Sequence, residues 1–252
     1  MKDWITPEWP SPANVRALFT TRQGGVSQDV EGKYAGLNLG DHVEDDHALV
    51  QQNRQLLRNY LPSDPCWLKQ IHGSRFVWVD ALKSEHHDFE ADAALSRTQG
   101  VVCAVLVADC LPILLCNRGG SIVGAIHAGW RGLASGVIEN AVYGMNCRTS
   151  DVIAWLGPAI SNQYFEVGEE VRDTFVNQDG QSSLAFFAAT DTGKWFADIF
   201  MLAKQRLVNL GINQIYGGGE CTYSNPSQFY SYRRDKRTGR MAALIWLSAL
   251  NV

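Results

Sequence analysis

Two histidines and one cysteine lie at the edges of apolar segments, and each has a glycine or a proline close by. His127 opens the segment 127–132, Cys110 lies within 108–112, and His72 lies within 70–73. Histidine and cysteine bind zinc, and a set of three protein ligands leaves a fourth position open for water or substrate, as in catalytic zinc sites. The pattern therefore suggests a three-ligand metal site.

The neighbours of these residues favour a site over simple packing. Asp109 directly precedes Cys110 inside an otherwise apolar segment, and a buried acid needs a partner. His127, Trp130 and Arg131 crowd a glycine-rich turn from a strand to a helix, where backbone amides can face an anion. The remaining histidines stand in polar stretches and are interpreted as surface residues, namely His42, His47, His86 and His87.

Apolar periodicity and turn residues predict the elements that must hold these side chains. Runs rich in β-branched and apolar residues predict strands at 15–20, 76–79, 101–107, 113–116, 121–126, 152–156, 212–216, 229–232 and 241–247. Helical spacing predicts helices at 132–145, 167–176 and 196–210, and one more from a cap at Asp45 or Asp46 to about Tyr60. A short extended piece is expected at 37–40, a hairpin turn at 117–120 and a loop at 82–92.

Strands outnumber helices in this pattern, and many follow one another without a helix between them. That order favours an α+β fold over a doubly wound one. We therefore expect residues 1–252 to form a single domain with mixed β-sheets flanked by helices.

Composition narrows the class of protein. The net charge of −4 argues against nucleic-acid binding, which favours a dense basic surface. Six cysteines are too few for a disulfide scaffold, and Cys103 and Cys116 read as reduced packing residues. The longest apolar stretch, 101–116, is interrupted by Asp109 and Pro112, so it predicts no membrane span. With no signal peptide visible, a cytoplasmic protein is expected.

Six segments together resemble the laccase-domain family, also called the polyphenol oxidase or purine nucleoside phosphorylase family, whose bacterial members include a peptidoglycan-editing factor. They are 20–27, 37–40, 70–73, 108–112, 127–132 and 231–234. The resemblance implies a single α+β domain, usually monomeric, with zinc on His72, Cys110 and His127. It also implies phosphorolysis of adenosine, inosine, guanosine and S-methyl-5′-thioadenosine, together with adenosine deaminase activity.

Phosphorolysis requires a bound phosphate, and arginine matches phosphate oxygens with two parallel hydrogen bonds. Arg54, Arg131 and Arg233 are the candidates for that contact, although Arg54 could instead be a solvated helix residue and Arg233 part of a basic surface run. Asn38 is expected to orient a substrate hydroxyl, unless it serves only turn formation. The expected catalytic residues are Cys110, His127, Arg54 and Asn38.

Three alternatives remain open. The family is also described as a copper-dependent polyphenol oxidoreductase, but a multicopper enzyme needs more histidines than the six present. One blue-type copper would need an axial methionine, which the sequence does not place. In a second alternative, Cys110 is the nucleophile and His127 the base of a metal-free hydrolase. In the third, the protein binds or edits a peptidoglycan precursor.

Overall fold

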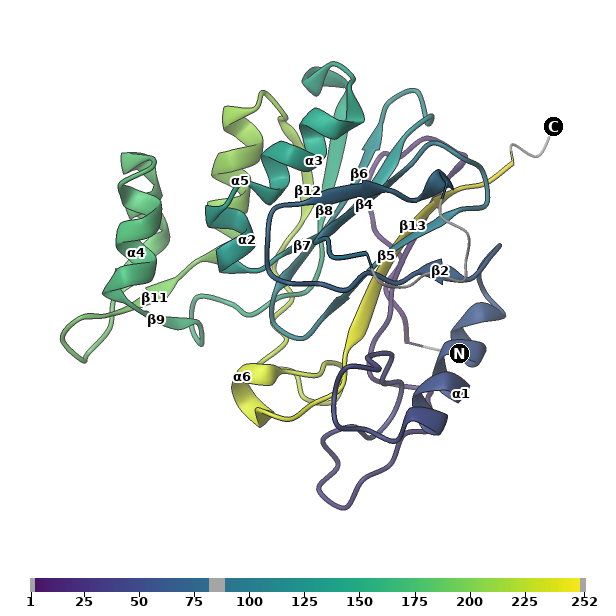
Figure 1. The fold of residues 1–252 in the computed structure, drawn as a ribbon. Helices are drawn as coiled ribbons and strands as arrows, with labels where there is room; N and C mark the ends of the chain where they lie inside the picture. Colours follow the sequence, from purple (N-terminus) through teal and green to yellow (C-terminus); the bar gives the residue numbers. More distant parts are fainter. Residues whose placement is uncertain (1–2, 82–88, 250–252) are drawn as a thin grey trace.

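Two β-sheets pack face to face at the centre of the molecule, and helices cover the outer side of the larger sheet (Figure 1). The computed structural model describes residues 3–81 and 89–249. Its strands are β1 (Val15–Phe19), β2 (Pro65–Cys66), β3 (Phe76–Trp78), β4 (Ala93–Ser96), β5 (Val102–Val107), β6 (Leu111–Asn117), β7 (Val123–Ala128), β8 (Val152–Leu156), β9 (Glu166–Gly168), β10 (Phe186–Ala188), β11 (Lys194–Ala197), β12 (Gln214–Gly217) and β13 (Met241–Leu247). Its α-helices are α1 (His47–Arg58), α2 (Trp130–Ala134), α3 (Val137–Met145), α4 (Glu169–Val176), α5 (Ile199–Asn209) and α6 (Tyr232–Asp235).

The larger sheet has the strand order β12-β8-β6-β7-β4-β3. Its outer pairs, β12 with β8 and β3 with β4, are parallel, whereas the central pairs are antiparallel. Strand β6 is buried on both faces, because its alternate side chains enter different cores. Ile113 and Leu115 pack toward the helices, and Leu114 and Cys116 pack toward the second sheet.

The second sheet has the order β1-β13-β5-β2 and closes the other side of the central core. Its outer face packs against α1 and the chain before it, where Leu57 and Trp67 join Leu244 in a smaller core. Asp46 accepts a hydrogen bond from the amide of Ala48 at 2.8 Å and so caps α1. A third sheet, β10-β11-β9, carries α4 at the edge of the helical layer (Figure 1).

The expected α+β class with mixed sheets flanked by helices is confirmed. Strands β8 and β13 have the expected bounds, and the hairpin at 117–120 joins the antiparallel strands β6 and β7. The predicted helix 132–145 is two helices, because the chain takes a left-handed turn at Gly136 (φ 86°). The piece at 37–40 forms no strand.

Three further expectations need correction. The strand at 229–232 is wrong: Phe229 and Tyr230 are core residues outside any sheet, and Ser231 caps α6 instead. The helices predicted at 167–176 and 196–210 begin too early. Their first residues belong to β9 and β11, and the helices α4 and α5 begin after these strands. Of the loop at 82–92, residues 82–88 lie outside the described residues, as do His86 and His87. Every helix in the described residues is too short or too polar to cross a bilayer.

Candidate metal centre and its pocket

Strand pairing brings the two histidines and the cysteine together at one end of the central sheets. In the β6–β7 pair, Pro112 lies opposite His127, so Cys110 in the turn before β6 comes close to the end of β7. His72 reaches the same place from the loop between β2 and β3. Their potential ligand atoms all lie within 4.8 Å of one another, and the two imidazole rings meet edge to face.

Asp92 organises this cluster although the sequence did not point to it. Its carboxylate is fully buried, and its Oδ1 atom lies 2.8 Å from Nδ1 of His127. The same carboxylate accepts hydrogen bonds from the backbone amides of Ile71, His72 and Gly73. One acid therefore orients the ring of one histidine and the backbone of the other. With Nδ1 engaged, Nε2 of His127 is left to face a metal ion.

The backbone near the site adopts strained conformations. His72 has φ 60° and Asp109 has φ 90°, a region that costs a residue with a Cβ atom about 1–3 kcal/mol. Such conformations persist where surrounding contacts fix them. Here the amide of His72 donates a hydrogen bond to Asp92, and the carboxylate of Asp109 accepts three. Gly129 leaves the room that the cluster needs, because a Cβ atom there would lie 3.0 Å from Sγ of Cys110.

The electrostatics of the cluster favour a thiolate. Burial alone would raise the pKa of Cys110, but the charge of His127 and hydrogen bonds from both histidines outweigh it and bring that pKa to about 6. Burial would likewise lower the pKa of His127, but Cys110 and Asp92 raise it to about 9. A thiolate beside two imidazoles is the donor set that zinc favours.

The cluster opens into a cavity of about 440 Å³, within the ~300–1,000 Å³ range of small-molecule sites. Its wall carries three aromatic side chains, Trp130, Phe165 and Tyr232. It also carries three arginines, Arg131, Arg233 and Arg240. An aromatic and cationic lining of this kind suits a flat, polar ligand bearing an anion.

None of these arginines forms an ion pair with a carboxylate of residues 3–81 or 89–249. Nη1 of Arg233 donates to the carbonyls of Tyr164 and Glu166, and Nη1 of Arg240 donates to those of Thr238 and Gly239. The guanidinium of Arg233 also lies 5.5 Å from the centre of the Phe165 ring. The other guanidinium nitrogens of both residues have no hydrogen-bond acceptor in that part of the chain. Burial lowers the pKa of Arg240 because the charged form is desolvated. The pocket therefore offers unsatisfied donors to an anion.

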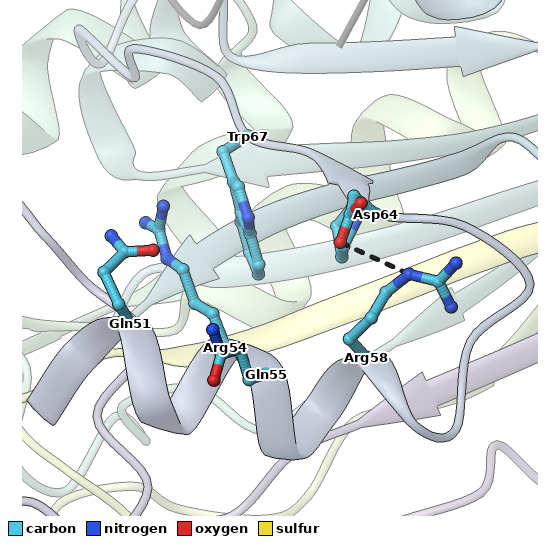
Figure 2. A pocket seen from close by; sticks show the side chains of 7 residues that line it. Gln51, Arg54, Gln55, Arg58, Asp64 and Trp67 are labelled. Atoms are coloured by element: carbon cyan, nitrogen blue, oxygen red, sulfur yellow. Dashed lines mark ion pairs between the residues drawn. The ribbon is translucent and has the colours of Figure 1, made fainter. Parts of the chain in front are cut away.

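Two of the expected catalytic residues lie elsewhere. Figure 2 shows Arg54 on α1, beside Trp67 in a separate pocket. Its Nε and Nη2 atoms donate to the carbonyl of Leu39, its Nη1 pairs with Asp41 at 3.1 Å, and its guanidinium lies 4.7 Å from the centre of the Trp67 ring. The structure thus does not bring Arg54 to the cluster of His72, Cys110 and His127.

Asn38 is fully buried, and both ends of its amide are used within the protein. Its Oδ1 atom accepts hydrogen bonds from the backbone amides of Gly40 and Arg240, and its Nδ2 atom donates to Asp45. It therefore lies behind the pocket wall and holds the backbone of Arg240. No local pattern in the sequence indicates that role, because the two residues are 202 positions apart.

Other pocket residues also escaped the sequence analysis. His42, expected to be a surface residue, is exposed but also lines the cavity. Asp92 could have been found in the same way as Asp109. It is an acid between the apolar residues Ala91 and Ala93, and an acid in an apolar segment needs a partner. The partner expected for Asp109 is confirmed: its carboxylate accepts hydrogen bonds from the segment that contains Arg233.

Comparison with known proteins adds four findings. Residues 16–248 match the protein family described as multi-copper polyphenol oxidoreductase laccase. A purine nucleoside phosphorylase of Escherichia coli is 49% identical, and the alignment covers 98% of this chain and 100% of that protein. One from Pseudomonas aeruginosa is 47% identical, with coverage of 98% and 99%. A crystal structure from Neisseria meningitidis is 44% identical with a TM-score of 0.92, covering 98% of this chain and 100% of that one.

Proposed function

This chain belongs to the multi-copper polyphenol oxidoreductase laccase family, and from that premise we propose that it is a zinc-dependent purine nucleoside phosphorylase that also deaminates adenosine. Its proposed substrates are adenosine, inosine, guanosine and S-methyl-5′-thioadenosine, with phosphate as the second substrate. We further propose that the 1–252 domain acts as a monomer in the cytoplasm, on small molecules rather than on nucleic acid or membranes.

One observation carries this proposal. The His72-Cys110-His127 cluster lies in the same cavity as three arginines with no carboxylate partner in the described residues. A hydrolase that used only water would have no need of such a cationic wall, whereas a phosphorylase must bind an anion next to its second substrate. The names of the related proteins agree with that interpretation.

The residues present fit zinc better than copper. Two imidazoles and a thiolate, with an acid bonded to one imidazole, form a site that zinc commonly occupies. A blue-type copper site would need an axial ligand such as methionine. Met145, Met201 and Met241 all lie outside the residues that line the cavity, and the sulfur of Met241 accepts a hydrogen bond from the amide of Tyr230.

In phosphorolysis, an oxygen of phosphate attacks C1′ of the ribose, the glycosidic C1′–N9 bond breaks, and the base leaves with the bonding electrons and takes up a proton. Ribose 1-phosphate and the purine base are the products. Arg131, Arg233 and Arg240 would hold the phosphate, and Trp130, Phe165 and Tyr232 would pack against the purine. A zinc ion at the cluster would supply Lewis-acid catalysis, including activation of the water that deamination consumes.

The test is an assay of inosine cleavage with and without phosphate, on protein whose metal content has been measured. Hypoxanthine and ribose 1-phosphate should form only when phosphate is present. Equal release of hypoxanthine in phosphate-free buffer would refute the phosphorylase assignment. Conversion of adenosine to inosine should proceed without phosphate, because water is the only second reactant.

A second candidate function uses the same atoms. Cys110 and His127 are placed as the nucleophile and the base of a cysteine hydrolase would be, and Asp92 as the acid that orients the base. In such an enzyme Cys110 would attack an acyl group, for instance in a peptidoglycan precursor, and no metal would be required. Elemental analysis separates the two functions, because full activity in metal-free protein would favour the hydrolase.

A further inference from the structure

Asp109 is a buried acid whose side-chain hydrogen bonds all come from the C-terminal part of the chain. It is 8% exposed. Its Oδ1 atom accepts a hydrogen bond from the hydroxyl of Thr222 at 2.6 Å. Its Oδ2 atom accepts one from the hydroxyl of Ser231 at 3.0 Å and another from the backbone amide of Arg233 at 2.6 Å.

These contacts connect two parts of the pocket that are distant in sequence. Asp109 directly precedes Cys110 in the turn between β5 and β6. Thr222, Ser231 and Arg233 belong to the segment 222–233, which leads into α6, and both Tyr232 and Arg233 line the cavity. The direct bond to the amide of Arg233 spans 124 residues. One carboxylate therefore sets the distance between the cysteine of the cluster and an arginine of the cationic wall.

The backbone of Asp109 shows that this arrangement is held firmly. A φ of 90° is unfavourable for a residue with a Cβ atom, and surrounding contacts must compensate for it. The backbone is also fixed from another side, because the amide of Ile160 donates to the carbonyl of Asp109 at 3.0 Å. With three donors already on its two oxygens, the carboxylate is poorly placed to bind substrate.

We propose that Asp109 is a positioning residue for phosphate binding, which acts by fixing Arg233 relative to Cys110. This inference rests on the proposed phosphorylase function. The guanidinium of Arg233 is held at Nη1 by the carbonyls of Tyr164 and Glu166, and its backbone is held by Asp109. Loss of the second anchor would let α6 shift, and the two free nitrogens of Arg233 would no longer meet a phosphate next to the cluster.

The test is a double-mutant cycle between Asp109→Gly and Arg233→Ala, read as the KM for phosphate and the KM for inosine. Glycine accepts the positive φ, so backbone strain is not a cause of any defect. Thr222→Val is a milder second variant, because it removes one hydroxyl from the network and keeps the volume of the side chain. Asp80→Ala is the matched control: Asp80 also accepts hydrogen bonds from a hydroxyl, on Ser96, and from a backbone amide, on Arg97, but lies outside the cavity.

We expect Asp109→Gly to raise the KM for phosphate about tenfold and that for inosine less than about twofold. In the Arg233→Ala background the same change should alter the KM for phosphate less than about twofold. Thr222→Val should give a smaller increase that also disappears in that background, and Asp80→Ala should leave both constants unchanged.

A rise in the KM for phosphate that is undiminished in the Arg233→Ala background would overturn the inference, as would an unchanged KM in Asp109→Gly. Equal rises for phosphate and inosine would also overturn it, because they would indicate a general loss of structure. Failure of the proposed function appears separately, in the wild-type protein itself. Wild-type protein without phosphate-dependent cleavage would overturn that function and this inference with it.

Discussion

Asp92 and His127 are joined twice, by side chain and by backbone. Nδ1 of His127 lies 2.8 Å from Oδ1 of Asp92, and the amide of His127 donates to the carbonyl of Asp92 at 2.7 Å. The pairing of β4 with β7 sets this contact, because the neighbouring residues Ala93 and Ile126 are register partners. The orientation of His127 in the candidate metal centre is therefore determined by the register of two strands.

The first prediction concerns Asp92→Asn. The amide cannot accept hydrogen bonds from the three backbone donors and the imidazole as a carboxylate does, so the ring of His127 and the backbone of His72 lose their common support. Loss of such a partner typically lowers metal affinity about 10–100-fold. Competition with a chromogenic chelator measures this affinity. Asp80→Asn serves as the control, and wild-type affinity in Asp92→Asn would contradict the assigned role.

The second prediction concerns the cysteines. Wild-type protein should contain about one zinc per chain, as a single catalytic site does. Cys110→Ala should lose both the metal and the activity, because it removes the thiolate ligand. Cys103→Ala and Cys116→Ala should keep both and lose only stability, by about 1–3 kcal/mol, since both side chains are fully buried in the core between the sheets.

Elemental analysis and urea unfolding of the three cysteine variants give the comparison. If Cys110→Ala keeps its zinc and loses only activity, the nucleophile assignment becomes the better one. Several copper atoms per wild-type chain would instead favour the oxidase that the family's description names.

Local patterns predicted much of the fold and pointed to the three residues that the structure brings together in the candidate metal centre. Runs of β-branched and apolar residues placed β8 and β13, and the position of His127 at the end of such a run reflected its place in β7. The rest of the site depends on contacts between distant segments. Arg240 enters the cavity because Asn38 and Leu39 bind its backbone, and no local pattern encodes a pairing across 202 residues.

Arg54 illustrates the same limit. Helical spacing predicted that it lies on a helix, as it does on α1. Whether its side chain reaches the cavity depends on how the sheets pack, which the spacing does not show. The helix packs against the outer face of the second sheet, where Trp67 and Leu244 meet it. Arg54 therefore supports the segment 38–40 from behind instead of entering the cavity.

The third prediction tests whether Arg240 contacts phosphate. Arg240→Ala should raise the KM for phosphate about tenfold or more and leave adenosine deamination much less affected, because only phosphorolysis uses phosphate. Arg58→Ala is the control, since Arg58 is an arginine of α1 that pairs with Asp64 outside the cavity. Equal loss of both activities in Arg240→Ala would argue against a phosphate contact.

The fourth prediction is that Arg54→Ala acts on stability. The change leaves the carbonyl of Leu39 without its two donors and Asp41 without its cation, which together cost roughly 1–3 kcal/mol. Urea unfolding measures the loss. Both activities should fall to a similar extent, and a selective loss of phosphorolysis would show that Arg54 contacts phosphate after all.

The last prediction tests the space inside the cluster with Gly129→Ala. Gly129 has φ −68° and ψ 161°, which alanine adopts without strain, so the substitution changes only what the new methyl group contacts. That group would lie 3.0 Å from Sγ of Cys110 and 3.2 Å from Cδ2 of His72, closer than ordinary packing allows. Both ligands would have to move, and we expect zinc affinity to fall at least tenfold. Gly180→Ala is the matched control, because a Cβ atom there meets nothing within 4 Å. Unchanged zinc affinity in Gly129→Ala would mean that His72 and Cys110 do not hold the metal together.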